Sequence, residues 1–302
     1  MSEPTPATPS AAQDARAPFR TLIEAADLLA LRARGGDLVV LDCGFDLVDV
    51  GAGERAYAES HLPGALYAHL DRDLSGTKTG RNGRHPLPPR AAFAERAGAW
   101  GIGRTTQVVA YDAQGGAYAA RAWWMLRWLG HEAVAVLDGG PAAWRAAGGS
   151  MQVERPTPGP RPPYPAGDAT MPTLDADAVL SSLGLGKVRI IDARSGERFR
   201  GEAEPIDPVA GRIPGAINRF HKDNLSADGR FKPAAELRVE FERLGLGASE
   251  AQPVTVVHQC GSGVTACHNL LAMAHAGFGS TALYPGSWSE WCADPTRPVA
   301  RG

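Results

Sequence analysis

Short aliphatic runs alternate with helix-length segments along the chain. Three runs of β-branched and aliphatic residues predict strands: Val188 to Asp192, Val254 to His258 and Thr281 to Tyr284. Leu237, Phe241 and Leu244 recur at i, i+4 and i+7, which predicts a helix over Pro233 to Leu244 with the proline in its first turn. Thr265 to Ala276, an apolar stretch with Leu270, Leu271 and Met273, predicts another helix. Strands and helices that alternate in this way are typical of a mostly parallel sheet flanked by helices on both faces, which is an α/β fold.

The second half of the chain repeats the landmarks of the first half. Four pairs of positions correspond, with offsets between 147 and 151 residues: Asp42 with Asp192, Pro63 with Pro214, Asp112 with Cys260, and Gly139 with Gly286. A repeat of this length is a whole domain and not a solenoid unit. The chain of 302 residues is also long enough for two domains of ordinary size. We therefore expect two tandem α/β domains.

The boundary between the two copies is rich in proline. Seven prolines fall between Pro156 and Pro172, a composition that favours an extended, semi-rigid linker. The sequence predicts an N-terminal domain over residues 19–149, a linker over 150–172 and a C-terminal domain over 173–302.

Composition and charge narrow the class of partner. Lys and Arg number 31 against 33 for Asp and Glu, so the chain has no basic excess for binding a nucleic acid backbone. No apolar run approaches the roughly 20 residues that cross a bilayer, and residues 1–18 lack the apolar run of a secretory signal. The four cysteines form no CxxC pair, which argues against a zinc ribbon or a disulfide framework. These observations predict a cytoplasmic protein without metal, membrane or nucleic acid.

Cys260 is the residue whose surroundings point most directly to chemistry. It follows a predicted strand and precedes the loop residues Gly261, Ser262, Gly263, Val264 and Thr265, which lead into a predicted helix. Two glycines let the backbone curl so that several N–H groups converge, and the helix start adds partial positive charge. An anion is stabilised there, so this position favours a nucleophilic thiolate. The plainer alternative is a cysteine that is only buried in an α/β core.

Two other motifs match the same loop weakly. Gly261 to Ala266 fits the G-x-G-x-x-A dinucleotide fingerprint, but no acidic residue closes the next strand about 20 residues later. A cysteine phosphatase would need an arginine six positions after its cysteine to grip phosphoryl oxygens, and that position is Ala266. The loop is better suited to a sulfur anion held by backbone N–H groups.

The motif Cys260-Gly261-Ser262-Gly263-Val264-Thr265-Ala266 resembles the active-site loop of tandem-domain rhodanese-type sulfurtransferases, most closely their mercaptopyruvate form. Further segments resemble landmarks of that family in the same order: 61–65, 137–140, 198–201 and 286–288 followed by Trp291. The resemblance implies two rhodanese-like domains, of which only the second carries the nucleophile. In the first loop Asp112 holds the place of the cysteine, and a carboxylate cannot accept a sulfane sulfur.

The resemblance also implies roles for other side chains. Asp71 and His85, from the N-terminal domain, are expected near Ser262, which would relay protons, and Arg198 is expected to bind the donor's carboxylate. Gly261, Gly263, Val264 and Thr265 would hold the sulfur by their N–H groups. The sequence departs from the family at Ile206, where mercaptopyruvate members often place a second arginine.

The expected reaction moves a sulfane sulfur from 3-mercaptopyruvate, through a persulfide on Cys260, to cyanide, a thiol or a carrier protein. No cofactor is needed, and a thioredoxin-like reductant is a candidate partner. Because the loop is neutral, an organic donor is favoured, whereas Ile206 leaves thiosulfate open as the main donor. A non-catalytic pair of protein-binding domains is the third interpretation, and the presence of Cys260 argues against it.

Overall fold

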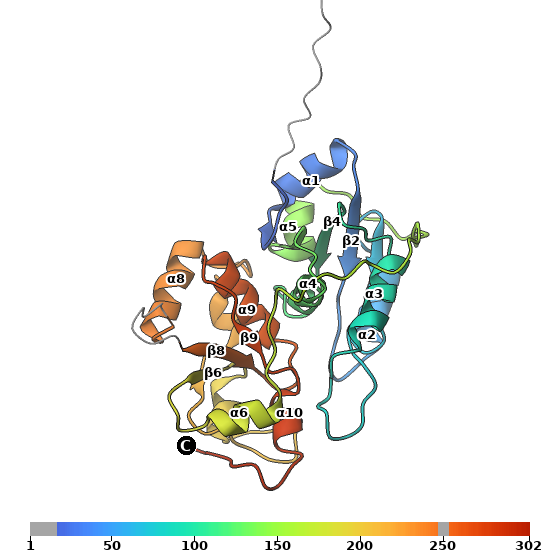
Figure 1. Ribbon diagram of the computed structural model, residues 1–302. Helices are drawn as coiled ribbons and strands as arrows, with labels where there is room; N and C mark the ends of the chain where they lie inside the picture. The colour runs from blue at the N-terminus through green and yellow to red at the C-terminus, as the bar shows by residue number, and fades with distance from the viewer. Residues whose placement is uncertain (1–16, 247–253) are drawn as a thin grey trace, which may run out of the picture.

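Two parallel sheets, one in each half of the chain, form the framework of the computed structural model, which describes residues 17–246 and 254–302 (Figure 1). The first sheet has the order β1-β5-β4-β2-β3. Its strands are β1 Leu22–Ile23, β2 Leu38–Asp42, β3 Ala65–Tyr67, β4 Gln107–Tyr111 and β5 Val134–Leu137. Its helices are α1 Ala25–Ala33, α2 Ala52–Glu59, α3 Arg90–Ala99, α4 Ala119–Trp128 and α5 Gly140–Ala146.

The second sheet repeats the topology of the first. Its strands are β6 Val188–Asp192, β7 Ile217–Asn218, β8 Thr255–Gln259 and β9 Ala282–Leu283, in the order β7-β6-β8-β9. An isolated parallel bridge joins Thr173 to Leu283 at the place that β1 occupies in the first sheet. The helices are α6 Ala176–Ser182, α7 Gly196–Arg200, α8 Ala234–Arg243, α9 Ala266–His275 and α10 Ser287–Trp291, with a 3-10 helix at His221–Asn224. The duplicated landmarks therefore correspond to duplicated folds.

Each pattern that predicted an element in the second half corresponds to one in the structure. The strand at 188–192 is confirmed as β6, whereas β8 begins and ends one residue later than predicted and β9 is shorter. The predicted helices are α8 and α9. Pro233 lies just before α8, with φ −52° and ψ 142°, and not within its first turn. Leu237 and Phe241 are fully buried, as the spacing predicts.

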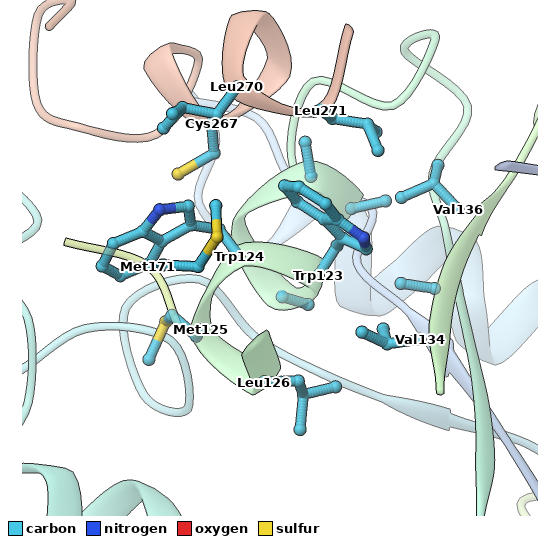
Figure 2. Packing of buried hydrophobic residues seen from close by; sticks show 14 of the residues in the cluster. Trp123, Trp124, Met125, Leu126, Val134, Val136, Met171, Cys267, Leu270 and Leu271 are labelled. Atoms are coloured by element: carbon cyan, nitrogen blue, oxygen red, sulfur yellow. The ribbon is translucent and has the colours of Figure 1, made fainter. Parts of the chain in front are cut away.

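The two sheets share one hydrophobic core. Buried residues of α3 and α4 pack with buried residues of α8 and α9 in a single cluster, while smaller clusters cover the outer face of each sheet. Figure 2 shows Cys267, Leu270 and Leu271 of α9 facing Trp123 and Trp124 of α4. Because α4 and α9 directly follow the corresponding loops after β4 and β8, their packing brings both loops to the interface of the two halves.

The proline-rich segment between α5 and α6 lies against the first half of the chain. Arg161 and Tyr164 donate backbone hydrogen bonds to the carbonyl groups of Gly98 and Ala94, and Met171 is buried in the shared core. Among the residues that the structure describes, no helix has the length and the apolar character needed to cross a bilayer.

Candidate active site

Cys260 lies between the end of β8 and the beginning of α9, at the carboxyl edge of the second sheet. Only 2% of its surface is exposed. Its Sγ accepts a hydrogen bond from the N–H of Gly263 at 3.1 Å. Gly263 has φ +76°, and a Cβ at this position would lie 2.3 Å from the carbonyl oxygen of Pro285. Only glycine can therefore turn the loop so that this N–H points at the sulfur.

The loop also has backbone donors that are not used within the protein. In residues 17–246 and 254–302, no hydrogen-bond acceptor pairs with the N–H groups of Ser262, Val264 and Thr265. These residues directly precede α9, and a helix N-terminus has unpaired N–H groups and a partial positive charge. The loop therefore has donors available for an anion attached to Cys260.

Ser287, at the beginning of α10, fixes the backbone of the cysteine. Its Oγ accepts the N–H of Cys260 at 3.1 Å, and the N–H of Trp288 donates to the Cys260 carbonyl at 3.0 Å. Ser287 has φ +54°, a left-handed conformation that is costly for a residue with a side chain. Gly140 has the same φ at the corresponding place in the first domain. The second domain thus keeps a strained serine where its hydroxyl orients Cys260.

His85 reaches Ser262 from the other domain. Its Nδ1 lies 2.7 Å from Ser262 Oγ, a hydrogen bond in which the imidazole tautomer decides whether the histidine or the serine is the donor. Burial lowers the pKa of His85 to about 3, so the imidazole is neutral near pH 7. Asp71 Oδ1 lies 3.6 Å from His85 Nε2, beyond hydrogen-bond distance, and is paired with Lys78 at 2.7 Å. The structure therefore joins His85 to Ser262 directly, while Asp71 stands beside the pair.

Two arginines from different domains converge over Gly261. Arg198 of α7 donates to Glu204 and Asp207, and Arg84 of the first domain is paired with the other oxygen of Asp207. A Cβ on Gly261 would lie 2.7 Å from Arg84 Nη2 and 3.5 Å from Arg198 Nη1. In the described part of the chain, neither of these two nitrogens donates to a carboxylate, and Arg84 Nε is buried with no acceptor. Unused guanidinium donors thus face the loop beside Cys260.

Sequence reasoning missed Arg84, which follows a glycine in a proline-rich loop and has no pattern that signals a site. It also emphasised Ile206, whose side chain is 43% exposed. Asp207, the next residue, is the one that holds both arginines. Burial raises the pKa of Asp207, while the two guanidinium groups oppose that rise.

A pocket of about 190 Å³ opens onto Cys260. Both domains line it: Leu47, Arg84 and Tyr118 come from the first, and Arg198, Phe220 and His221 come from the second. Val264 and Thr265 of the loop are also on its wall. His221 was not identified from the sequence. Burial lowers its pKa to about 4, and its Nδ1 lies 3.2 Å from the carbonyl oxygen of Ala193, so it is a neutral wall residue.

The corresponding loop of the first domain is filled by its own side chain. Asp112 Oδ1 accepts the N–H groups of Gln114 and Gly116, and Oδ2 accepts those of Tyr118 and Ala119, each at 2.8 Å. The loop after β4 therefore binds an anion that is covalently part of the chain. This loop carries no thiol, and the N–H groups that bind the Asp112 carboxylate are not available to another anion.

The other three cysteines are held as thiols by burial. Burial raises the pKa of Cys267 to about 12 and of Cys292 to about 11, and it raises that of Cys43 well above its usual range. All three are less than a tenth exposed, and none lies on the pocket wall. Cys260 is the cysteine that the pocket reaches.

Comparison with known proteins gives consistent matches over most of the chain. The model of the rhodanese-like domain matches twice, at residues 25–147 and 175–294. A protein of Pseudomonas aeruginosa named as a probable 3-mercaptopyruvate sulfurtransferase is 50% identical over 280 residues, which cover 92% of this chain and 97% of the relative. The thiosulfate sulfurtransferase of Gallus gallus is 34% identical over 267 residues, covering 85% and 87%. The solved structure of 3-mercaptopyruvate sulfurtransferase from Leishmania major superposes with a TM-score of 0.78 at 31% identity, covering 91% of this chain and 75% of that one.

Proposed function

Because the chain belongs to the family of rhodanese-like sulfurtransferases, we propose that it takes sulfur from 3-mercaptopyruvate onto Cys260 and passes it to cyanide, a thiol or a carrier protein. The observation that carries this choice of donor is the pair of guanidinium groups beside Gly261. A thioredoxin-like protein is one candidate for the acceptor or reductant.

In the proposed reaction the Cys260 thiolate attacks the sulfur of mercaptopyruvate. A sulfur–sulfur bond forms, the carbon–sulfur bond breaks, and its electron pair goes to the carbon that becomes the methyl group of pyruvate. That carbon takes the proton that leaves the donor's thiol, and Cys260 becomes a persulfide anion. An acceptor thiolate or cyanide then attacks the terminal sulfur, which restores the Cys260 thiolate.

The contacts of the loop support a role for Ser262 and His85 in moving that proton. Ser262 lies two residues from the nucleophile, and its hydroxyl is hydrogen-bonded to a neutral imidazole. A neutral His85 has one ring nitrogen that can accept a proton and one that can donate a proton. A protonated imidazole has two donors and could not accept one. The unused N–H groups of Ser262, Val264 and Thr265 support a second role for the loop, which is to stabilise the persulfide anion.

The charges around the pocket favour a monocarboxylate over a dianion. Arg84 and Arg198 are already paired with Asp207 and Glu204, so the cluster has little net positive charge. Its unused N–H groups can still hold one carboxylate by hydrogen bonds. Thiosulfate would bring two negative charges into this nearly neutral cluster. We therefore expect a higher kcat/KM with mercaptopyruvate, and thiosulfate is the alternative main donor on the same fold.

Replacing Cys260 by Ser tests the persulfide. We expect C260S to lose turnover with every donor, because an alkoxyl oxygen cannot carry the sulfane sulfur. Mass spectrometry of the wild-type protein after incubation with mercaptopyruvate should show a gain of about one sulfur atom on the peptide that contains Cys260. The buried Cys292, replaced by Ala, serves as the control and should still load. A C260S variant that turns over, or a wild-type protein that gains no sulfur, would contradict the proposal and favour a non-catalytic domain pair.

Replacing Arg84 or Arg198 by Met tests the carboxylate site. Each variant should lose one charge-assisted hydrogen bond to the donor's carboxylate, which is worth about 1.5 to 3 kcal/mol. The KM for mercaptopyruvate is therefore expected to rise roughly tenfold to a hundredfold. Arg200→Met is the matched control, since Arg200 is an exposed neighbour on the same helix. Steady-state assays with both donors at the same pH and acceptor provide the measurement. Thiosulfate turnover several-fold more efficient than mercaptopyruvate turnover would assign the thiosulfate alternative.

A further inference from the structure

Arg121, on α4 of the domain that has no nucleophile, is fully buried. Its guanidinium donates to three carbonyl oxygens: Leu74 at 3.3 Å, His85 at 3.1 Å and Gly263 at 3.1 Å. Among residues 17–246 and 254–302, no carboxylate forms an ion pair with it. A buried guanidinium without a counter-charge is costly, so its position requires an explanation.

Two of the three carbonyl groups, those of Gly263 and His85, belong to segments that the proposed reaction needs. Gly263 gives its N–H to Cys260 Sγ and its carbonyl to Arg121. His85 gives its ring to Ser262 and its carbonyl to the same guanidinium. One rigid group therefore ties the loop of one domain to the histidine of the other, across the interface between them.

The charges near Cys260 balance only when Arg121 and a sulfur anion are both counted. The other guanidinium groups of the site share three carboxylates: Arg84, Arg194 and Arg198 with Asp192, Glu204 and Asp207. The two histidines of the site, His85 and His221, are neutral because burial lowers the pKa of each, and Lys78 is paired with Asp71. Arg121 is left as one positive charge, and two sulfur atoms lie beside it: Cys267 Sγ shares the Gly263 carbonyl with Arg121, and Cys260 Sγ accepts the N–H of the same glycine. Cys267 is a thiol, since burial raises its pKa to about 12. Of these two sulfur atoms, that of Cys260 can supply the balancing negative charge.

We propose that Arg121 is a positioning residue of the sulfurtransferase reaction, which holds the Gly263 turn and the His85 loop together and balances the charge of the Cys260 thiolate and persulfide. The non-catalytic domain thereby contributes a fixed cation to the nucleophile of the other domain. This inference rests on the proposed role of Cys260 as the sulfur carrier.

The test compares Arg121→Met, Arg121→Lys and Arg127→Met. Arg127 is on the same helix but outside the site, where it stacks on Trp123, so it serves as the control. The rate at which iodoacetamide alkylates Cys260 is measured against pH, with the peptide identified by mass spectrometry. Removal of a nearby cation is expected to raise the midpoint of that profile by about one to three pH units in R121M. The midpoint in R127M should match that of the wild type.

Kinetics separate this role from a merely structural one. Arg121 is not among the residues that line the pocket, so R121M should lower kcat at pH 7 while the KM for mercaptopyruvate changes little. Lysine keeps the charge but cannot reach all three carbonyl groups, so R121K should keep the alkylation midpoint near the wild-type value and recover part of kcat. Should R121M fail to fold, Arg121→Gln is the second neutral variant: a raised alkylation midpoint supports the charge balance, and a wild-type midpoint overturns it.

The two proposals fail in different ways. A C260S variant that turns over would remove the sulfur carrier and with it the proposed function. If C260S is inactive while folded R121M keeps the wild-type alkylation midpoint, only the role of Arg121 is wrong.

Discussion

At the scale of single residues, Asp112 and Cys260 show what a loop of this kind does. Both follow the central strand of their sheet, and both precede the helix that packs at the domain interface. In the first domain the carboxylate of Asp112 accepts four backbone N–H groups of its loop. In the second domain the side chain of Cys260 accepts one N–H group of its loop, that of Gly263, and other N–H groups of the loop stay unused. The first loop is thus stabilised by a permanent anion, whereas the second is left free for a transient one.

Replacing Asp112 by Ala should destabilise the protein by at least about 3 kcal/mol, because buried N–H groups lose a charged acceptor. Asp112→Asn should have an intermediate effect, since its carbonyl oxygen still accepts while its amide does not. Urea unfolding followed by circular dichroism measures the free energy of unfolding. The exposed Asp177 on α6, replaced by Ala, is the control and should shift stability by no more than about 0.5 kcal/mol. Equal stability of D112A and wild type would show that the carboxylate contributes nothing net.

At the scale of elements, α4 and α9 determine how the two loops meet. Residues Ala119–Leu126 of α4 and Ala266–Met273 of α9 are all buried. A helix that is buried on all sides lacks the polar face that would show which side points to solvent. Its sequence therefore predicts a helix but does not predict which neighbouring elements it packs against. The contact between α4 and α9 supplies that information in the structure, and at this interface Arg121 and Cys267 both donate to the carbonyl oxygen of Gly263.

Leu271→Ala tests the importance of this interface for stability. Leu271 is fully buried against α4, so truncation should leave a cavity and lower the free energy of unfolding by about 2 to 5 kcal/mol. The same substitution at Leu180 of α6, which is 37% exposed, should cost much less. Activity per folded molecule should also fall in L271A, because the catalytic loop is attached to the beginning of α9. Unchanged unfolding in L271A would mean that neighbouring side chains refill the space.

At the scale of the whole molecule, the site exists only between the domains. Contacts that cross the interface include Arg84 with Asp207, His85 with Ser262 and Arg121 with Gly263. His268 of α9 likewise lies 3.0 Å from the carbonyl oxygen of Gly115 in the first domain. The first domain therefore supplies part of the pocket wall, namely Leu47, Arg84 and Tyr118, although it carries no nucleophile.

Buried histidines predict the response of the whole protein to acid. Burial lowers the pKa of His85, His258 and His268 to about 3 each, whereas in the unfolded chain it lies near 6.5. Between these values the unfolded state binds more protons, so stability rises with pH and is lost as pH falls from 6.5 toward 3. From pH 7 to pH 5 each histidine should cost about 2 kcal/mol. Urea midpoints at the two values measure the loss.

His258→Leu isolates one share of this effect. His258 is fully buried, and its Nε2 lies 3.2 Å from Met273 Sδ. Among the described residues it forms no ion pair, so a leucine removes a titrating group without breaking one. The stability of H258L should depend less on pH than that of the wild type by about 2 kcal/mol over the same interval. Parallel pH profiles for the two proteins would contradict the buried-histidine explanation.

The sequence by itself determined the α/β fold, the duplication and the position of Cys260 before a glycine turn. These features are local: strand and helix spacing, a left-handed glycine and a helix start all act within a few residues, so they can be read along the chain. The domain boundaries and the roles of Asp71, His85, Ser262 and Arg198 stay predictions, although the structure brings His85 to Ser262 and Arg198 to the pocket.

Only the tertiary structure decided which charged groups surround the nucleophile. Arg84, Arg121 and His221 have no periodicity or motif of their own, and two of them come from the other domain. Along the chain, the absence of an arginine at Ile206 leaves the preferred donor open, whereas in space Arg84, more than 120 positions away, contacts Asp207. Electrostatic interactions depend on distance in space and on burial, and neither is encoded by spacing in the sequence.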